Sequence, residues 1–279
     1  MKTLLVPVDF STTSDNTIRF AAAWCTQYEY QRVILLKTFY QNVFSDIVVA
    51  AEYGAVNQDF MQQHREEAGA RLEAMSQTIK AADANISVAI SFSELPILRA
   101  VVEMIREENP EMVMLGSDHN DTDSLIARNV IPIAKASPIR VMMVPAGFTY
   151  EPVKNALVPV NFKTMHELDK LSNLKASPTW AATRLMVLNV DPEEHYAHPD
   201  DQFREDEYHL HEYLKNFHHE LYYRNDRDII QSIIAFTASN EVQVIIALPG
   251  KRSFLYALTH KSISEAICRS AKVPVIILK

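Results

Sequence analysis

Apolar and polar positions along the chain form two alternating patterns, short apolar runs and longer amphipathic segments. Short runs that are apolar on both faces and end in a polar turn are typical of parallel strands with helices on each side. The amphipathic segments repeat apolar residues at helical spacing. The longest, Gln58–Ala82, has an apolar stripe at Met61, Ala68, Leu72, Met75 and Ile79. This alternation predicts an α/β fold.

Each half of the chain is predicted to contain five strands alternating with four helices. The predicted strands of the first half are Lys2–Val8, Arg32–Thr38, Ile86–Phe92, Glu111–Gly116 and Ile139–Val144. Its predicted helices are Ser14–Gln27, Gln58–Ala82, Pro96–Glu108 and Leu125–Lys135. Pro132 is expected to bend or shorten the last helix. A short insert, Asp46–Ala55, has no assigned structure.

The second half repeats this order of elements. Its predicted strands are Asn155–Val160, Thr183–Val190, Glu220–Arg224, Val242–Leu248 and Val273–Leu278. Its predicted helices are Met165–Ala176, Asp200–Phe217, Arg227–Ser239 and Ser262–Ser270. Strict alternation of this kind predicts a doubly wound parallel sheet in each half.

One apolar run occurs twice with nearly the same residues. Leu4–Ser11 reads LLVPVDFS, and Ala156–Lys163 reads ALVPVNFK. Since the later strands repeat too, the period is about half the chain. We therefore expect two tandem doubly wound domains, each with a five-stranded parallel sheet, at 1–146 and 154–279, joined by a linker at 147–153.

The composition argues against several classes of function. A net charge of −8 on 279 residues disfavours binding to nucleic acid or to an anionic membrane surface. The apolar runs are too short to span a bilayer, and no secretion signal pattern precedes the first strand. We expect a cytoplasmic protein in which Cys25 and Cys268 are isolated buried thiols, although the two could pair in a disulfide.

Ligands bind to parallel sheets of this kind beyond the carboxyl ends of the strands. Asp9 and Asn161 follow the two copies of the repeated run, so each is expected to lie where a ligand would bind. Their difference makes the two halves chemically unequal. The chain has five glycines, which leaves little room for phosphate-binding loops, because such loops need glycine for close backbone approach and positive φ.

These features resemble the universal stress protein family. The resemblance is carried by the strand ending in VPVDFS, the strand Glu111–Gly116 ending in glycine, and a last strand of the S-x-x-P-V type, and it covers both halves. The second half, with PGKRSFLYALTHKS before its last helix, looks like the divergent tandem members common in the Bacteroidetes. The resemblance implies two adenine nucleotide alpha hydrolase-like domains, packed as a pseudo-dimer through their fifth strands.

For nucleotide-binding members, the resemblance also implies a loop G-x-x-G, nine residues, then G-S or G-T, which holds the ATP phosphates at a helix N-terminus. An Asp after the first strand contacts the adenosine end. In the first half Asp9 is present and Gly116 fills the first glycine position, but His119 and Asn129-Val130 replace the other small residues. Three further carboxylates would repel a triphosphate unless a metal intervened: Asp118, Asp121 and Asp123.

The second half departs from the loop differently. Asn161 replaces the Asp, Ala247 replaces the first glycine, and Gly250 keeps the second. His260-Lys261, or Lys261-Ser262 with one residue inserted, falls at the third position. The candidate phosphate ligands of this half are Gly250, Lys251, Arg252 and Ser262, which would supply close approach, two cations and a hydroxyl donor. In the first half, Asp9 would accept a hydrogen bond from a ribose or base donor, and Gly116 would leave space for the ligand.

A histidine-rich segment offers a different chemistry. The predicted helix carries four polar residues on one face, and imidazole and carboxylate at such spacing can hold zinc: Glu207, His211, Lys215 and His218. We expect a solvated polar face here, because no HExxH motif or cysteine pair accompanies it. The run Asp200–Glu207 is expected to start the helix, and Ser11 or Ser14 to cap an earlier one.

Taken together, the sequence predicts a tandem universal stress-like protein that is not an enzyme, with no metal and no cofactor expected. It would bind or scaffold an unidentified protein partner in a stress response, as a monomer with an internal pseudo-dimer or as a homodimer. One alternative is a switch that binds an adenine nucleotide, ATP or AMP, with weak or no hydrolysis. The other is a metal-binding regulator that uses the histidine-rich helix.

Overall fold

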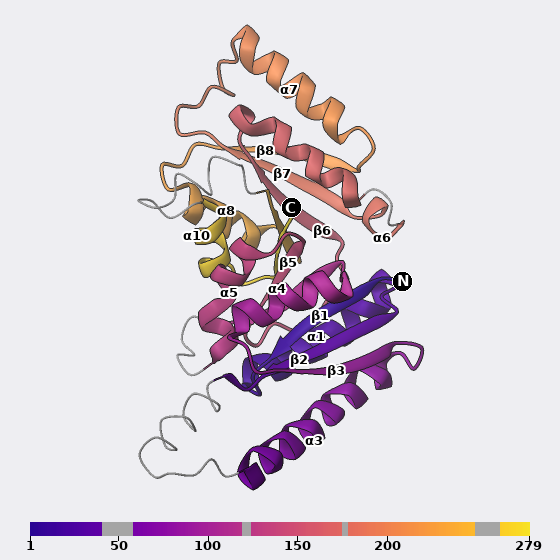
Figure 1. The fold of residues 1–279 in the computed structure, drawn as a ribbon. Coiled ribbons are helices and arrows are strands. Elements are labelled where there is room, and N and C mark those ends of the chain that lie inside the picture. The colour runs from indigo at the N-terminus through magenta and orange to yellow at the C-terminus, as the bar shows by residue number, and fades with distance from the viewer. Residues whose placement is uncertain (41–57, 119–123, 175–177, 249–262) are drawn as a thin grey trace, which may run out of the picture. The chain divides into compact units, whose positions relative to one another are not determined.

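A computed structural model describes residues 1–40, 58–118, 124–174, 178–248 and 263–279 (Figure 1). The chain forms two compact units, Met1–Tyr150 and Glu151–Lys279, and the division falls inside the segment 147–153. The insert Asp46–Ala55 lies outside the described residues. Each unit is built around a parallel sheet, as the sequence predicts, and the proposed packing of the two through their fifth strands stays a prediction.

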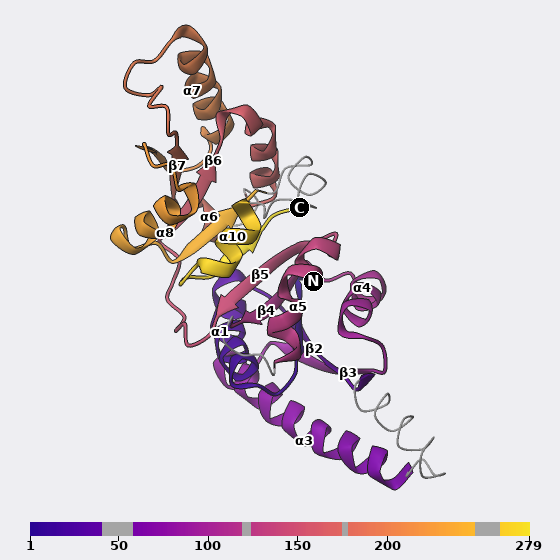
Figure 2. The same ribbon diagram turned by 90° about the vertical axis from the view of Figure 1, so that its left-hand side faces the viewer.

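Unit 1 has the strand order β3-β2-β1-β4-β5. Its strands are β1 (Thr3–Val8), β2 (Arg32–Thr38), β3 (Ser87–Ser93), β4 (Met112–Ser117) and β5 (Arg140–Pro145). Its helices are α1 (Thr12–Tyr28), α3 (Gln58–Ala82), α4 (Ile97–Glu108) and α5 (Leu125–Ala136). β1 and β4 are buried along their whole length, because α1 packs with α3 on one face of the sheet and α4 with α5 on the other (Figure 2).

Unit 2 repeats the arrangement with the order β10-β9-β6-β7-β8. Its strands are β6 (Asn155–Val160), β7 (Arg184–Val190), β8 (His219–Arg224), β9 (Val244–Ala247) and β10 (Val275–Ile277). Its helices are the 3₁₀ helix η1 (Phe162–Leu174), α6 (Pro178–Ala181), α7 (Asp201–Leu214), α8 (Ile229–Ser239) and α10 (Ile263–Ser270). η1 packs against α7, and α8 packs against α10.

Three helices differ clearly from their predictions, and one of them is α7, which ends at Leu214 and not at the predicted Phe217. The segment predicted as the helix Met165–Ala176 begins at Phe162 and is a 3₁₀ helix. Its buried leucines recur every third residue, a spacing that matches three residues per turn: Leu168, Leu171 and Leu174. In the first unit, α5 continues through Pro132 to Ala136, so the proline does not shorten it.

The register of the two sheets aligns the repeats residue by residue. Leu5 pairs with Val113, and Leu157, its counterpart in the second copy, pairs with Ile245. Counting three residues on from each partner places Leu248 at the position of Gly116. The sequence alignment that gave this position to Ala247 is therefore wrong by one residue, since register along a ladder is fixed by pairing. Either residue has a side chain where the family's loop has a glycine.

Both cysteines are buried thiols and neither forms a disulfide, as the sequence analysis expects. Burial raises the pKa of the Cys25 thiol to about 12. Cys25 lies in unit 1 and Cys268 in unit 2, so each thiol can report on its own unit. Within the described ranges, no helix combines the length and apolar character needed to cross a membrane.

We predict that each thiol becomes reactive only when its own unit unfolds. Cys268→Ala leaves Cys25 as the reporter of unit 1, and Cys25→Ala leaves Cys268 as the reporter of unit 2. Labelling with a thiol reagent in native buffer should be at least about 100-fold slower than in concentrated urea, because a buried thiol reacts only after opening. Fast labelling of either thiol without urea would contradict the burial described above.

Candidate functional site

The carboxyl edge of unit 1 is organised by the side chain of Asp9, which directly follows β1. Its Oδ1 accepts hydrogen bonds from the Ser11 amide at 3.1 Å, the Ser11 hydroxyl at 2.6 Å and the Ser14 hydroxyl at 2.7 Å. Its Oδ2 accepts from the Ser124 hydroxyl at 2.6 Å and the Ile126 amide at 2.9 Å. The carboxylate thereby joins the end of β1 to the N-termini of α1 and α5.

This hydrogen bonding holds Asp9 in its charged form. Burial by itself raises the pKa of Asp9, but the Ile126 amide and the hydroxyls of Ser11, Ser124 and Ser14 outweigh it and lower the pKa to about 2. A carboxylate offers about four lone-pair sites, and five donors from the chain already occupy them. Both oxygens of Asp9 are therefore occupied by donors of unit 1, so neither is free to accept a hydrogen bond from a ribose or a base.

Ser11 is also the N-cap of α1, because its side chain accepts a hydrogen bond from the Ser14 amide. Ser124 caps α5 in the same way through the Ala127 amide. The prediction that Ser11 or Ser14 caps the first helix is confirmed. These caps and Asp9 form one network of helix-terminal donors and acceptors.

Gly116 has an equally structural explanation. A Cβ atom built on Gly116 would lie 2.6 Å from Thr13 Cγ2 and 2.6 Å from Thr17 Oγ1. Both threonines belong to α1, which packs on β4. The absence of a side chain at Gly116 thus lets α1 approach the sheet. The helix fills the space beside this glycine, so that space is not open to a ligand.

Two basic side chains lie beside Asp9 at this edge of unit 1. The Phe10 ring lies 4.8 Å from Lys37 Nζ and 4.1 Å from Arg71 Cζ. Arg71 also donates to the Phe10 carbonyl at 3.1 Å, which supports the positive φ of 66° at Phe10. Burial lowers the pKa of Lys37, while the Asp9 charge acts in the opposite direction.

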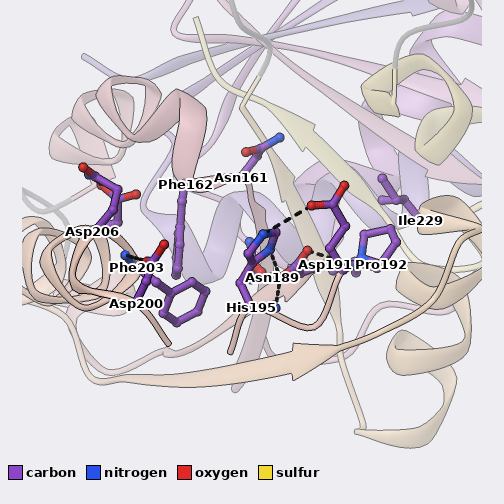
Figure 3. A pocket seen from close by; sticks show the side chains of 13 residues that line it. Asn161, Phe162, Asn189, Asp191, Pro192, His195, Asp200, Phe203, Asp206 and Ile229 are labelled. Carbon is purple, nitrogen blue, oxygen red and sulfur yellow. Dashed lines mark hydrogen bonds and ion pairs between the residues drawn. The ribbon is translucent and has the colours of Figure 1, made fainter. Parts of the chain in front are cut away.

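Unit 2 has a cavity of about 370 Å³ at the carboxyl ends of β6 and β7 (Figure 3). The lining comes from the turn after β6, the end of β7 and the loop after it, the first turns of α7, and the start of α8. The lining residues are Asn161, Phe162, Asn189, Val190, Asp191, Pro192, Glu193, His195, Asp200, Gln202, Phe203, Asp206 and Ile229. This volume is within the range of small-molecule sites.

The loop after β7 is folded around Asp191. Its Oδ1 accepts from the Glu193 amide at 3.1 Å, and its Oδ2 accepts from the His195 amide at 2.7 Å and lies 2.9 Å from His195 Nδ1. Burial acts to raise the pKa of Asp191, but these hydrogen bonds outweigh it and lower the pKa. The other ring nitrogen of His195 lies 3.2 Å from Glu193 Oε2. His195 is thus shared between two carboxylates.

The opposite wall is the N-terminal part of α7. Asp200 is its N-cap and accepts from the Phe203 amide at 2.8 Å, which confirms that the acidic run starts this helix. Asp206 accepts from the Gln202 side chain at 3.1 Å. The Phe203 ring packs on Phe162 with centroids 4.9 Å apart, so the acidic wall has an aromatic base.

One polar atom in the cavity lining has no partner. Asn189 is 8% exposed, and its Nδ2 donates to the Val160 carbonyl at 3.2 Å. Its Oδ1 is buried and accepts no hydrogen bond from any described residue. A buried carbonyl oxygen without a donor is uncommon in folded proteins.

The sequence-predicted site residues have different outcomes. Asp9 and Gly116 are brought together at one edge and serve packing, whereas Gly250, Lys251, Arg252 and Ser262 lie outside the described residues. Asn161 lines the cavity of unit 2. The sequence analysis missed Asn189 and the loop from Asp191 to His195. The rule that located Asp9, a polar residue at the carboxyl end of a parallel strand, also applies to β7 and would have found them.

Residues of the histidine-rich segment interact in pairs. Tyr223 donates to Glu207 at 2.5 Å, Lys215 pairs with Glu212 at 3.1 Å, and His211 Nδ1 lies 2.9 Å from His219 Nε2. His211 therefore meets His219 of β8. Because α7 ends at Leu214, Lys215 and His218 lie beyond the helix, and the prediction that they share a helical face with Glu207 and His211 is wrong. Among the residues that the structure describes, no three or more His, Cys, Asp or Glu side chains are grouped to hold a metal ion.

Comparison with known proteins agrees with this architecture. A family model, the universal stress protein family, matches residues 1–145. A universal stress protein from Archaeoglobus fulgidus DSM 4304 is 16% identical, with 99% of this chain and 96% of that chain covered and a TM-score of 0.63. A structure from Pseudomonas aeruginosa UCBPP-PA14, named as a candidate universal stress protein, is 14% identical, with 100% and 93% covered and a TM-score of 0.57.

More distant matches add nothing about ligands. A universal stress protein solved in complex with cAMP is 14% identical and covers 52% of this chain and 98% of its own, with a TM-score of 0.37. That likeness is too low to carry an argument. No curated protein matches the chain. The two full-length likenesses therefore show the fold and its duplication.

We predict that Asp9→Asn destabilises unit 1 by about 1–3 kcal/mol at neutral pH. An asparagine accepts hydrogen bonds on one oxygen only, so the donors that face its NH₂ group are left unpaired. The pKa of folded Asp9, about 2, lies below its ordinary 3.8, so the charge stabilises the fold above about pH 4. This contribution is lost as the pH falls toward 2. Urea unfolding at several pH values should show the parent and variant converging in acid.

The matched control for Asp9→Asn is Glu107→Gln, an exposed carboxylate of α4 in the same unit. It should change the unfolding free energy by less than about 0.5 kcal/mol. If the Asp9→Asn deficit at neutral pH is no larger than that of the control, the network is not stabilising.

We predict that Gly116→Ala destabilises unit 1 by about 1–3 kcal/mol, because the new methyl group overlaps α1. Combining it with Thr17→Ala removes one of the two overlapping atoms and should recover part of the loss. Urea unfolding of the two single variants and the double variant measures this coupling. Simple additivity of the two single changes would show that the space beside Gly116 is not limiting.

Proposed function

Since the chain belongs to the universal stress protein family, we propose that it is a cytoplasmic stress-response binding protein without catalytic activity. In this proposal, unit 2 receives a small ligand in its cavity, unit 1 is closed at the corresponding edge, and neither half grips a nucleoside triphosphate. Scaffolding of a protein partner is compatible with this role.

The observation that carries the proposal is the cavity at the carboxyl ends of β6 and β7. Doubly wound sheets bind ligands beyond the carboxyl ends of their strands, and β6 is one of the two strands, with β9, between which the strand order reverses. The four carboxylates in its lining would repel phosphate: Asp191, Glu193, Asp200 and Asp206. A ligand that enters it is therefore expected to lack a phosphate chain.

The hydrogen bonds of unit 1 support the same conclusion. The hydroxyls of Ser11, Ser14 and Ser124 all donate to Asp9. Hydroxyls that are committed to a carboxylate with a low pKa have no base to activate them as nucleophiles. This favours a structural use of these residues over catalysis.

An ATP- or AMP-binding switch is the main competing function, because Lys251, Arg252 and Lys261 make the last loop of unit 2 basic. A ligand at 100 times its dissociation constant raises the stability by about 2.7 kcal/mol. Binding with a physiological affinity would therefore be evident as a rise in the unfolding temperature.

We predict that millimolar Mg-ATP or AMP raises the unfolding temperature by less than about 1 °C, because neither half retains the small residues that grip phosphate. A fluorescence or calorimetric melt measures this. The variant Lys261→Ala with Ser262→Ala is the matched control. A clear rise with Mg-ATP that this variant abolishes would establish the nucleotide switch and overturn the proposal.

A further inference from the structure

β8 is the last strand in the order of unit 2, and within the described residues it pairs only with β7 (Figure 1). This pairing is parallel and regular along the strand, with no bulge. The neighbouring helices pack chiefly elsewhere, α7 on η1 and α8 on β7 and α10. Proteins usually protect an edge strand with proline, lysine, a bulge or a covering helix. The sequence of β8, HELYYR, contains neither proline nor lysine.

The hydrogen bonds to β7 show which backbone groups of β8 face outward. The Leu185 amide donates to the His218 carbonyl at 2.8 Å, and the Asp191 amide donates to the Arg224 carbonyl at 2.8 Å. Successive residues of a strand direct their backbone groups to opposite sides, so the even-numbered residues of β8 face β7. The amides and carbonyls that face away from the sheet form what we call the β8 edge, and they belong to His219, Leu221 and Tyr223.

Helices hold the side chains of β8 on both faces of the sheet. On one face, the side chains of His219 and Tyr223 form hydrogen bonds with α7. On the other face, the Tyr222 ring and the Arg224 guanidinium lie 5.0 Å and 5.5 Å from the centre of the Phe236 ring of α8. The strand is therefore held in place before any partner arrives, which lowers the entropic cost of adding a further strand.

The charges of β8 are complementary to those of a second, antiparallel copy. Glu220, Tyr222 and Arg224 share one face, because alternate residues of a strand do so. A two-fold axis at Tyr222 places Glu220 of each copy directly opposite the partner's Arg224. The same register places Leu221 opposite the partner's Tyr223, and both residues belong to the β8 edge. One arrangement therefore provides both the hydrogen bonds and two pairs of opposite charge.

Other two-fold registers are less favourable. An axis at Glu220 brings two like carboxylates together, and an axis at Tyr223 brings Glu220 toward the partner's Asp226. An axis at Leu221 gives Glu220 no cation. Because like charges directly opposite each other destabilise a pair of strands, the charges of β8 favour the register centred on Tyr222.

We propose that the β8 edge binds a second copy of this chain, through an antiparallel pair of β8 strands related by a two-fold axis at Tyr222. The same patch of each copy is used, as in other two-fold dimers. A second copy is favoured over an unrelated strand because Glu220 and Arg224 make β8 complementary to itself in reverse. The contact is small, so the dissociation constant is expected to be on the order of 10–100 μM. The inference goes beyond the proposed function and does not depend on the cavity.

Charge reversal tests the dimer and its register together. Sedimentation equilibrium of the full chain, from about 5 to 500 μM, measures association. Glu220→Arg and Arg224→Glu should each weaken it at least about tenfold, because each variant replaces two ion pairs with two repulsions. When the two variants are mixed in equal amounts, a heterodimer should form, because every opposed pair then again has opposite charge.

Two further variants separate the backbone contact from general effects of charge. Leu221→Pro removes an amide of the β8 edge and no hydrogen bond to β7, so it should abolish association. Glu107→Arg is the matched control, because it makes the same change of charge at an exposed residue of α4 in unit 1. It should leave the dissociation constant within about twofold of the parent protein. Slow labelling of Cys268 verifies that unit 2 of each variant is folded.

The possible results are distinct. A parent protein that stays monomeric at the highest concentration overturns the inference. A dimer that persists in both Glu220→Arg and Leu221→Pro also overturns it, because such a dimer uses another surface. Folded charge variants that stay monomeric after mixing contradict the register centred on Tyr222. None of these results depends on ligand binding by unit 2, so the proposed function succeeds or fails separately.

Discussion

The carboxylate of Asp9 is the interaction on which the structure of unit 1 depends. Parallel strands and their helices are far apart in sequence, and Asp9 joins β1 to the starts of α1 and α5 through donors as distant as Ser124 and Ile126. A charged group at this edge is tolerated because five donors surround it. The same donors remove Asp9 from ligand binding. One residue thus connects three elements at this edge of unit 1.

The second copy of the repeat shows what happens without that carboxylate. Asn161 stands in place of Asp9, and Lys163 in place of Ser11, so the charged acceptor and one of its hydroxyl donors are both missing. The edge of unit 2 has a cavity instead, with acidic walls. At the corresponding edge of unit 1, Lys37 and Arg71 lie over Phe10. The two copies of the fold therefore place different side chains at equivalent positions of this edge.

Much of the fold could be predicted because the apolar and polar pattern within each segment indicates its secondary structure. The strands Arg32–Thr38 and Asn155–Val160 and the helix Gln58–Ala82 have the predicted bounds, since each combines a clear apolar pattern with clear ends. The segment at Phe162–Leu174 was predicted as an ordinary helix, because spacings of three and four are hard to separate in one short segment. The candidate site was less accessible. The identity of Asp9 is visible in the sequence, but two of its five donors, Ser124 and Ile126, lie 115 and 117 residues further along the chain. The position of Asn189 at the carboxyl end of β7 was accessible to the same strand-end rule, but its burial, and an oxygen to which no described residue donates, arise only from tertiary packing.

The most direct test of this account is the titration of Asp9 itself, followed by carbon NMR of the carboxyl group in protein labelled at aspartate, with and without Mg-ATP. The account predicts a pKa near 2 that Mg-ATP leaves unchanged, because the chain's own donors occupy both oxygens. A pKa at or above the ordinary value of 3.8, or a resonance that moves when the nucleotide is added, would show that Asp9 is open to a ligand and would contradict it.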